Sequence, residues 1–374
     1  MSQERLAIGC MTGTSLDALD VCAVRAGGSG LGLTCAVVDL CSRSLADVGL
    51  GSKLRALAEG VPTTAGDIAR LALEFGEFHA AAIAALTARV GKPALVAVHG
   101  QTIFHAPPVS WQMVNPWPIA RAIGCPVVSD LRGADLACGG QGAPITPLAD
   151  WVLFRSADQS RALVNLGGFC NITLLPAGGG ERGLSHIKGF DVCACNHVLD
   201  GAARAALGKA YDVDGAAAES GRADEPAAAE LSALLARQRG AGRSLGTGDE
   251  SLAWVKRWGS KLRGPDLLAS ACEAIGRVIG AEVRVADHVV VAGGGAHNRA
   301  LLAAIARHAG RGVATSDSLG VPIGGREAAE MAVLGLLSMD GVRITLPQVT
   351  GMEPGASLVG GSWVNPAAIA DRTG

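Results

Sequence analysis

The chain has 374 residues, 49% of them hydrophobic, with 32 basic and 34 acidic residues and a formal net charge of −2 at pH 7. This length is too great for one ordinary hydrophobic core and suits two. The sequence has no basic run or stripe for a nucleic-acid backbone and no apolar run near the ~20 residues that span a membrane. We therefore expect a cytoplasmic protein without nucleic-acid or membrane partners.

Ten cysteines are scattered through apolar segments rather than clustered in short loops. A chain of this size needs no disulfide framework to hold its fold. We expect reduced thiols, most of them buried as small apolar side chains.

Strand-like and helix-like segments alternate along the chain, as an α/β fold requires. The chain opens with a predicted hairpin, followed by a third strand, a helix with a regular apolar face, and two short strands that run into polar or glycine-rich loops. In order, these segments span residues 5–10, 20–26, 31–38, 67–89, 95–99 and 126–129.

A second predicted hairpin, residues 161–166 and 172–175, repeats the opening pattern about 150 residues later. Residues 214–231 are expected to form a solvated helix or loop, and an apolar strand at 286–292 runs into Gly293–Gly295 and a predicted helix at 298–309. Two similar halves indicate duplicated domains that face each other across a cleft. We place one at residues 1–131 with roughly 356–374, and the other at 132–355.

Three turns of small residues follow apolar strands: GCMTGTSLDALD (9–20), NLGGFCN (165–171) and AGGGAHN (292–298). Glycine permits positive φ and close approach, so each turn could present backbone N–H groups to a phosphate. Neither a Walker loop nor a GxGxxG motif on an opening βαβ unit is present. One such turn alone is typical of an ordinary hairpin, whereas three together favour a nucleotide cleft.

The first turn adds hydroxyls and the carboxylate of Asp17, a set that holds terminal phosphates and orients hydrated Mg²⁺. We predict ATP and Mg²⁺ as ligands, with Asp17 reaching the metal through water. The alternative is that Ser15 and Asp17 only cap a turn. The predicted ATP contacts are Gly13, Thr14, Ser15, Asp17, Asn165, Gly167, Gly168, Gly293, Gly294, Gly295 and Asn298.

Polar residues follow the strand at 95–99 directly, where open α/β sheets place ligand contacts. His99, Gln101 and Thr102 are therefore candidate substrate contacts, and Arg132 could hold a hydroxyl or carboxylate with its planar fork. For His99 taken alone, we favour the alternative of a structural histidine whose hydrogen bonds are satisfied within the protein. We interpret the run Gly139–Pro144 as a crossing between domains. It could serve there either as a hinge or as a contact surface.

Asp191 follows an apolar Gly-Phe pair, and a carboxylate in a dry cleft suits deprotonation of a hydroxyl or water. Cys193, Cys195 and His197 alternate just after it, but no second Cys/His cluster accompanies them, which disfavours zinc. A serine hydrolase is disfavoured because the chain has no GxSxG elbow.

Taken together, these blocks resemble the anhydro-N-acetylmuramic acid kinase family, within the actin-like and hexokinase-type sugar kinases. The opening is similar to that family's phosphate loop, G-x-M-S-G-T-S-L-D-G-x-D, with Thr12 and Ala18 as departures. The other matching blocks are collinear and cover nearly the whole chain. The first of them is HGQT (99–102) together with His105 and Pro107, and the second is GGQGAP (139–144) together with Asp130, Arg132 and Asp135. The others are NLGGFCNIT (165–173), GGGAHN (293–298), Glu327-Ala328 and LPQVTG (346–351).

The resemblance implies a two-domain actin-like, ribonuclease H-like fold with an interdomain cleft, and a homodimer. It implies ATP-dependent opening and O6 phosphorylation of 1,6-anhydro-N-acetylmuramic acid in cell-wall recycling, with Asp191 as base and Glu327 at the catalytic site. Here Val192–Cys195 replaces the family's T-G-P-G stretch after the base, while Asn196 and Asp200 are kept. This departure leaves two alternatives open: a kinase for another anhydrosugar or hexose, or a catalytically weak nucleotide-binding homologue.

Overall fold

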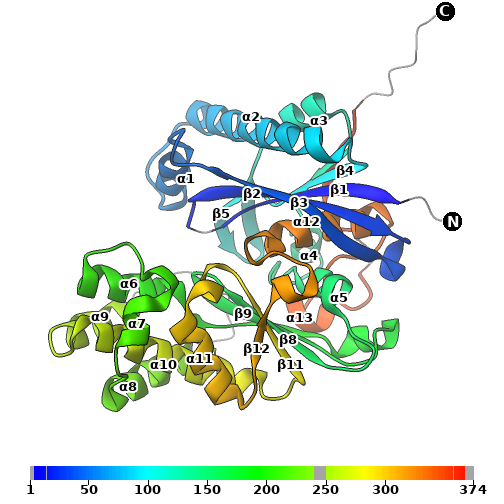
Figure 1. Cartoon of the computed structure of the whole chain (residues 1–374). Coiled ribbons are helices and arrows are strands. Elements are labelled where there is room, and N and C mark those ends of the chain that lie inside the picture. Colours follow the sequence, from blue (N-terminus) through cyan, green and yellow to red (C-terminus); the bar gives the residue numbers. More distant parts are fainter. Residues whose placement is uncertain (1–3, 14, 240–249, 357, 367–374) are drawn as a thin grey trace, which may run out of the picture. The chain divides into compact units, whose positions relative to one another are not determined.

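The computed structural model describes residues 4–13, 15–239, 250–356 and 358–366, which form two compact units (Figure 1). Unit 1 comprises Met1–Leu153 and Gly325–Gly374, and unit 2 comprises Phe154–Gly324. The chain thus passes between the units at 153/154 and 324/325, whereas the sequence placed these boundaries at 131/132 and 355/356. The difference has a physical reason: the glycine-rich run 132–144 and the helix that starts at Arg326 both bond into unit 1.

The central sheet of unit 1 has six strands in the order β13-β7-β4-β1-β2-β3. The first three strands in sequence form an antiparallel meander, and β4 then pairs in parallel with β1, and β7 in parallel with β4. The strands span Arg5–Thr12 (β1), Ala18–Gly27 (β2), Thr34–Ser44 (β3), Leu95–Val98 (β4), Val127–Ser129 (β7) and Ser362–Val364 (β13); β5 (Gln101–Ala106) and β6 (Val109–Met113) form a separate hairpin.

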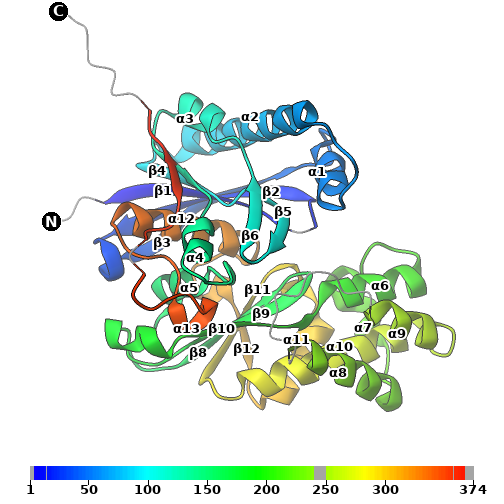
Figure 2. The same cartoon turned by 180° about the vertical axis from the view of Figure 1, so that it is seen from behind.

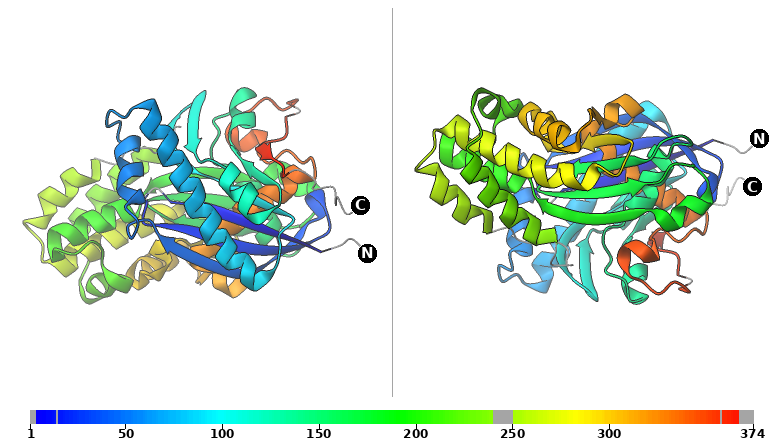
Figure 3. Two further views of the ribbon diagram at one scale, coloured as in Figure 1. Left: turned by 90° about the horizontal axis from the view of Figure 1, so that it is seen from above. Right: turned by 90° about the horizontal axis from the view of Figure 1, so that it is seen from below.

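Helices cover both faces of this sheet (Figures 1 and 3). They span Leu50–Ala58 (α1), Ala65–Val90 (α2), Trp117–Ile123 (α3), Gly133–Ala137 (α4), Pro147–Phe154 (α5), Arg326–Met339 (α12) and Pro347–Thr350 (α13). The start of α12 lies directly on β1, because a Cβ added to Gly9 would fall 1.9 Å from the carbonyl oxygen of Ala328. Only glycine permits this approach of helix to strand.

The long helix α2 starts where the Thr64 side chain accepts a hydrogen bond from the Asp67 backbone N–H. No uninterrupted apolar run marks it in the sequence, yet among the described helices it is the one long and apolar enough to cross a membrane. Its apolar residues Ala82, Ile83 and Leu86 pack with the strands of the sheet in one buried cluster. The unit 1 core therefore accounts for this apolar face.

Unit 2 repeats the strand order of unit 1. Its sheet runs β10-β9-β8-β11-β12, with an antiparallel meander of β8 (Arg161–Leu166), β9 (Phe169–Leu175) and β10 (Lys188–Ala194), and with β11 (His288–Ala292) and β12 (Val313–Thr315) added in parallel. The predicted second hairpin is confirmed. A meander of three strands followed by two parallel strands, present twice, is the duplicated ribonuclease H-like arrangement of actin-like proteins, so the predicted fold class is confirmed.

The helices of unit 2 bury a second core against its sheet. They span Asn196–Leu207 (α6), Ala216–Ser220 (α7), Glu225–Arg239 (α8), Glu250–Gly259 (α9), Gly264–Val283 (α10) and Arg299–Ala309 (α11). Residues 214–231, expected to be solvated, contribute Ala227, Ala228 and Leu231 to this core. The predicted helix is present and many of its residues are exposed, but one face is buried, because alanine-rich composition hides the apolar face that α8 turns toward α10.

Candidate functional site

The predicted ligand segments of unit 1 leave one edge of its sheet. Cys10 pairs with Val98 and Ala97 with Val128 in parallel register, so β1, β4 and β7 end side by side. The loops that follow them are the first small-residue turn, the His99 segment and the Arg132 segment. The carboxyl ends of neighbouring parallel strands are where such sheets collect ligand contacts.

His99 and Arg132 are in direct contact at this edge. The His99 ring is 4% exposed, and its Nδ1 lies 2.8 Å from the Gly100 carbonyl oxygen. Its Nε2 accepts hydrogen bonds from Arg132 Nε at 3.2 Å and Nη2 at 2.8 Å. Burial, reinforced by the Arg132 charge, lowers the pKa of His99 to about 3. The ring is therefore neutral, with its proton on Nδ1, and both of its nitrogens are bonded within the protein.

The buried polar atoms of unit 1 without a hydrogen-bond partner in the described part of the chain include three in the segments that resemble the family's motifs. These three are Thr12 Oγ1, Gln101 Oε1 and His105 Nε2. Thr12 and Gln101 are each 3% exposed. A buried polar atom without a partner is costly, so such atoms point to groups supplied by a ligand. Thr102, the remaining predicted contact of this segment, accepts a 3.4 Å bond from Gln112.

The turn after β1 is short and internally bonded. Gly13 accepts a hydrogen bond from Leu16 N–H at 3.1 Å, and Leu16 has a positive φ of 57°. Arg55 binds the carbonyl oxygen of Ser15 at 2.6 Å, while the side chains of Ser15 and Asp17 are exposed. Thr14, predicted to contact ATP, lies outside the described residues.

In unit 2 the two other glycine turns meet. β8 and β11 are parallel, with Asn165 paired to Ala292, so Gly167 and Gly293 follow neighbouring strand ends. Gly293 has φ 81°, and a Cβ there would lie 2.8 Å from Asn165 Oδ1. The close approach requires glycine, as the turn composition predicted.

Asn196, at the start of α6, fills the space beside these turns. Its backbone N–H donates to the Gly167 carbonyl at 3.0 Å, and its side-chain Nδ2 donates to the Leu166 carbonyl at 3.0 Å. A Cβ on Gly295 would lie 2.8 Å from its Oδ1. The described residues 165–168, 196 and 293–295 therefore form one small-residue surface.

The other predicted ATP residues of unit 2 have defined structural tasks. Asn298 is 8% exposed and caps α11, its Oδ1 accepting from Leu301 N–H at 3.0 Å. A Cβ on Gly168 would lie 2.5 Å from the His197 ring, which stacks edge-on against Phe169. Gly294 has the most room, with Asn196 Nδ2 3.7 Å from an added Cβ.

Asp191 stands on the sheet face opposite the helices of unit 2. It pairs with Asn171 on β9, and Asn171 pairs with Asn165 on β8. Directly paired residues share a face, whereas the alternating residues Val164 and Ile172 belong to the helix-covered core. Asp191, Asn171 and Asn165 thus form a polar row that ends beside the glycine turns.

A β-bulge follows Asp191, because the pairing register shifts between Asp191 and Cys193. Val192, Cys193 and Cys195 are all fully buried in the core of unit 2. The stretch that departs from the family pattern is therefore packed interior, and the bulge re-aims the strand at Asp191.

The thiols of this stretch are unsuited to metal binding. Burial raises the pKa of Cys193 to about 12 and that of Cys195 well above its usual range, and a metal needs thiolate. No group of three or more His, Cys, Asp or Glu side chains in the described residues could hold a metal ion.

Glu327 is half-buried in the first turn of α12, in unit 1. Its neighbour Arg326 is 2% exposed and bonded to Asp150, which is 0% exposed. Glu330, also 0% exposed, lies 2.7 Å from Arg326 Nε, and burial raises its pKa. Sequence inspection missed Asp150, Arg326 and Glu330. The spacing of Arg326 and Glu330 was a signal, since i and i+4 share one helix face.

Asn171 and Asn196 were also outside the predicted set. Both lie inside motifs that the sequence does display, NLGGFCN and the stretch after Asp191. Their importance depends on strand register and on the start of α6, which a single sequence does not fix.

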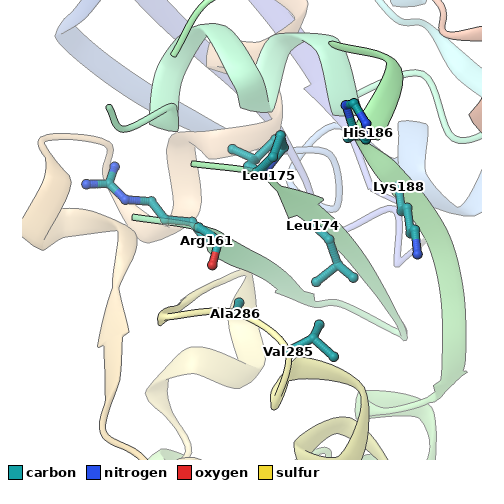
Figure 4. A pocket seen from close by; sticks show the side chains of 9 residues that line it. Arg161, Leu174, Leu175, His186, Lys188, Val285 and Ala286 are labelled. Carbon is teal, nitrogen blue, oxygen red and sulfur yellow. The ribbon is translucent and has the colours of Figure 1, made fainter. Parts of the chain in front are cut away.

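A separate pocket lies at the other end of the unit 2 strands (Figure 4). Its lining includes Arg161, the first residue of β8, and Lys188, the first of β10, together with His186, Leu174 and Val285. The glycine turns follow the opposite end of β8, so this pocket is not the predicted nucleotide site.

Comparisons with known proteins give one family. Residues 5–364 match the family model described as anhydro-N-acetylmuramic acid kinase. The anhydro-N-acetylmuramic acid kinase of Chromohalobacter salexigens is 35% identical over 95% of this chain and 98% of that protein. Those of Acidiphilium cryptum and Salinibacter ruber are each 32% identical, over 98% and 93% of this chain and 99% and 94% of theirs.

Among solved structures, a ROK family glucokinase from Streptomyces griseus in complex with glucose and AMPPNP is 14% identical with a TM-score of 0.38, over 88% of this chain and 98% of that one. The activator of the 2-hydroxyisocaproyl-CoA dehydratase from Clostridium difficile, with bound ADPNP, is 13% identical with a TM-score of 0.42, over 88% and 94%.

Proposed function

The chain belongs to the anhydro-N-acetylmuramic acid kinase family, and we propose that it hydrolyses the 1,6-anhydro bond of 1,6-anhydro-N-acetylmuramic acid and phosphorylates the sugar at O6. The coarser activity is that of the family: an ATP-dependent sugar kinase, which transfers a phosphoryl group to an alcohol. The product would be N-acetylmuramic acid 6-phosphate, made in the cytoplasm during recycling of cell-wall amino sugars.

The observation that carries this proposal is the setting of Asp191. Its carboxylate stands on a bulged strand, in one row with Asn171 and Asn165, and that row ends beside the glycine turns. A carboxylate here is a suitable base for a water molecule.

The reaction then balances as follows. Water loses a proton to Asp191, and its oxygen forms the new bond to the anomeric carbon. The bond between that carbon and O6 breaks, and O6 takes the γ-phosphoryl group while ADP leaves. Arg132 would bind the carboxylate of the muramic acid, and Glu327 would contact the reacting sugar.

The glycine turns fit a nucleotide because Gly294 has no side chain and nothing lies within 3.7 Å of an added Cβ, so a phosphate could approach its backbone. Mg²⁺ fits hard oxygen ligands, and the exposed carboxylate of Asp17, in the turn after β1, can supply one. Asp17 would hold the ion through water, and the ion would neutralise charge on the phosphates.

The direct test is incubation of the wild-type chain with ATP, Mg²⁺ and the anhydro sugar. Mass spectrometry should find the 6-phosphate, and in H₂¹⁸O the label should appear at the anomeric oxygen. Asp191→Asn should lower kcat by several powers of ten while nucleotide affinity is kept, because water activation has no substitute. Asp158→Asn, an exposed aspartate of unit 2, is the matched control.

A different sugar is the second candidate, favoured by the buried residues Val192–Cys195 in place of the family's T-G-P-G stretch. A panel of anhydrosugars and hexoses in a coupled ADP assay separates the two: a clear preference for another sugar would replace the proposed substrate. Tight ATP binding without phosphorylation of any sugar would indicate the catalytically weak homologue.

A further inference from the structure

The guanidinium of Arg132 is held from two directions within unit 1. His99 Nε2 accepts from its Nε and Nη2, at 3.2 and 2.8 Å, and the Gly142 carbonyl accepts from its Nη1 at 2.5 Å. A guanidinium carries its donors in one plane, so two acceptors at different edges fix both its position and its plane.

The acceptor at Gly142 is itself fixed by a buried pair. Asp135, in α4, accepts the Gly142 backbone N–H at 2.7 Å with Oδ2 and the Thr350 hydroxyl at 2.6 Å with Oδ1. Asp135 and Thr350 are each 1% exposed, and Thr350 is the last residue of α13, the helix labelled in Figure 2. The Thr350 carbonyl also accepts the Gln141 N–H at 2.8 Å.

This arrangement indicates a structural role for two motifs that take no part in the proposed reaction. The run Gly139–Pro144 was read as a domain crossing or hinge, but it lies wholly in unit 1 and is tied to α4 and α13. The closing motif LPQVTG supplies Thr350. Neither Asp135 nor Thr350 is open to solvent, so neither is placed to touch a sugar.

His99 has the same character. Its Nδ1–H donates to Gly100 and its Nε2 accepts from Arg132, which leaves no ring nitrogen for a substrate. Of the two interpretations of His99, the geometry favours the structural one: the ring holds the Arg132 side chain in place.

We propose that His99, Asp135 and Thr350 are positioning residues that together hold Arg132 in the orientation with which it binds the anionic group of the sugar. This rests on the proposed function for the identity of that group, a carboxylate. A long, flexible arginine loses much freedom on binding, so a prebuilt frame lowers the cost of ordering the guanidinium when the carboxylate binds.

The kinetic test uses Thr350→Val, which keeps the shape of the side chain and removes the hydroxyl. In the wild-type background we expect the KM for the anhydro sugar to rise about 3- to 10-fold, with the KM for ATP unchanged; the typical net contribution of one hydrogen bond corresponds to this range. In an Arg132→Met background the same change should add no further rise. An equal effect in both backgrounds, or on ATP as well, would overturn the proposal.

His99→Ala and His99→Gln form a matched pair. The alanine variant removes the acceptor and should raise the sugar KM, while the glutamine carbonyl can accept from Arg132 and should restore most of the loss. Failure of both variants to the same extent, with unchanged thermal unfolding, would contradict a positioning task.

A readout independent of catalysis separates this inference from the proposed function. The Nε–H resonance of Arg132, assigned by its loss in Arg132→Lys, should shift in Thr350→Val and in His99→Ala. If the enzyme turns over no carboxylated sugar, the proposed function fails while these shifts still support the frame. An Arg132 resonance that is unmoved in both variants overturns it.

Discussion

Arg326 binds Asp150 through Nη2, with oxygen distances of 2.6 and 2.8 Å, although 176 residues separate the two in the sequence. Asp150 lies in α5, just before the chain leaves unit 1, and Arg326 opens α12, just after it returns. The pair therefore joins the two ends of unit 1 at which the rest of the chain is inserted. Glu330 also lies against this pair, 2.7 Å from Arg326 Nε, and burial raises the pKa of its carboxyl group.

Replacement of Arg326 by methionine should lower the free energy of unfolding by about 3–5 kcal/mol, because it leaves the Asp150 carboxylate buried without a counterion. Urea unfolding followed by circular dichroism measures the change. The double variant Arg326→Met/Asp150→Leu should recover part of the loss, since no uncompensated charge stays behind. Arg70→Met, which removes an exposed pair with Asp67, should leave the midpoint near that of the wild type; a similar midpoint for Arg326→Met would contradict the prediction.

The sequence was sufficient for features that depend on local pattern. The two hairpins, the long helix α2 and the strand–turn–helix around Gly293 all follow from apolar periodicity and small-residue turns, and the structure has each of them. The repetition of a hairpin at residues 161–175 led to the duplicated architecture, because a meander and its turns leave a recognisable order of residue types.

Features that depend on long-range contacts were not accessible. The unit boundary at 153/154 was missed because the glycine-rich run looked like a linker, whereas the Asp135–Thr350 bond that ties it to unit 1 spans 215 residues. The polar row at Asn171 requires strand register, and the buried partners of Arg326 require the packing of α5 on α12. The predicted site residues stay predictions until ligands are tested on them.

His79 should make the protein less stable as the pH falls below the usual histidine range. The ring is 0% exposed, its Nδ1 bonds the Phe75 carbonyl at 2.8 Å, and burial lowers its pKa from 6.5 to about 4. Between these values the unfolded chain binds a proton that the folded chain does not, so stability rises with pH through this window and is lost as pH falls.

Each such histidine contributes a slope of up to about 1.4 kcal/mol per pH unit. Denaturant unfolding of His79→Leu at pH 5 and 6 should show a slope smaller than that of the wild type by about this amount. Substitution of His288, an exposed histidine, by glutamine is the control. An identical slope in wild type and His79→Leu would show that the buried ring takes up its proton without unfolding.

The ten thiols should fall into two classes of reactivity. All are free; seven are buried, and Cys35, Cys41 and Cys138 are half-buried. Burial raises the pKa of Cys193 and Cys272 to about 12, and the thiolate is the reactive form. With Ellman's reagent at pH 8, at most three thiols should react quickly, and the rest at the rate of unfolding.

Variants identify the members of each class. Cys138→Ser should remove one fast equivalent, whereas Cys193→Ala should remove one slow equivalent and none of the fast ones. Rapid labelling of Cys193 in the folded protein would show that the stretch after Asp191 opens readily, contrary to its packing in the core of unit 2.

The glycine turns allow steric fit for a nucleotide to be tested apart from folding. A Cβ on Gly294 would meet nothing closer than 3.7 Å, so Gly294→Ala should leave the unfolding midpoint unchanged. If phosphates approach this backbone, the added methyl group should weaken ATP binding by roughly 10-fold or more, because the methyl takes the place of a close backbone contact. Calorimetric titration with a non-hydrolysable ATP analogue measures the affinity.

Two further alanine variants serve as comparisons for Gly294→Ala. Gly293→Ala combines φ 81° with a Cβ 2.8 Å from Asn165 Oδ1, so it should lower both stability and ATP affinity. Gly312→Ala, with nothing within 4 Å of the added Cβ, should change neither. If Gly294→Ala binds ATP as tightly as Gly312→Ala does, no phosphate approaches residues 293–295, and the nucleotide would have to be assigned to another part of the chain. Weakened binding with intact folding, in contrast, would locate the phosphates against the end of β11, since no protein atom accounts for the loss.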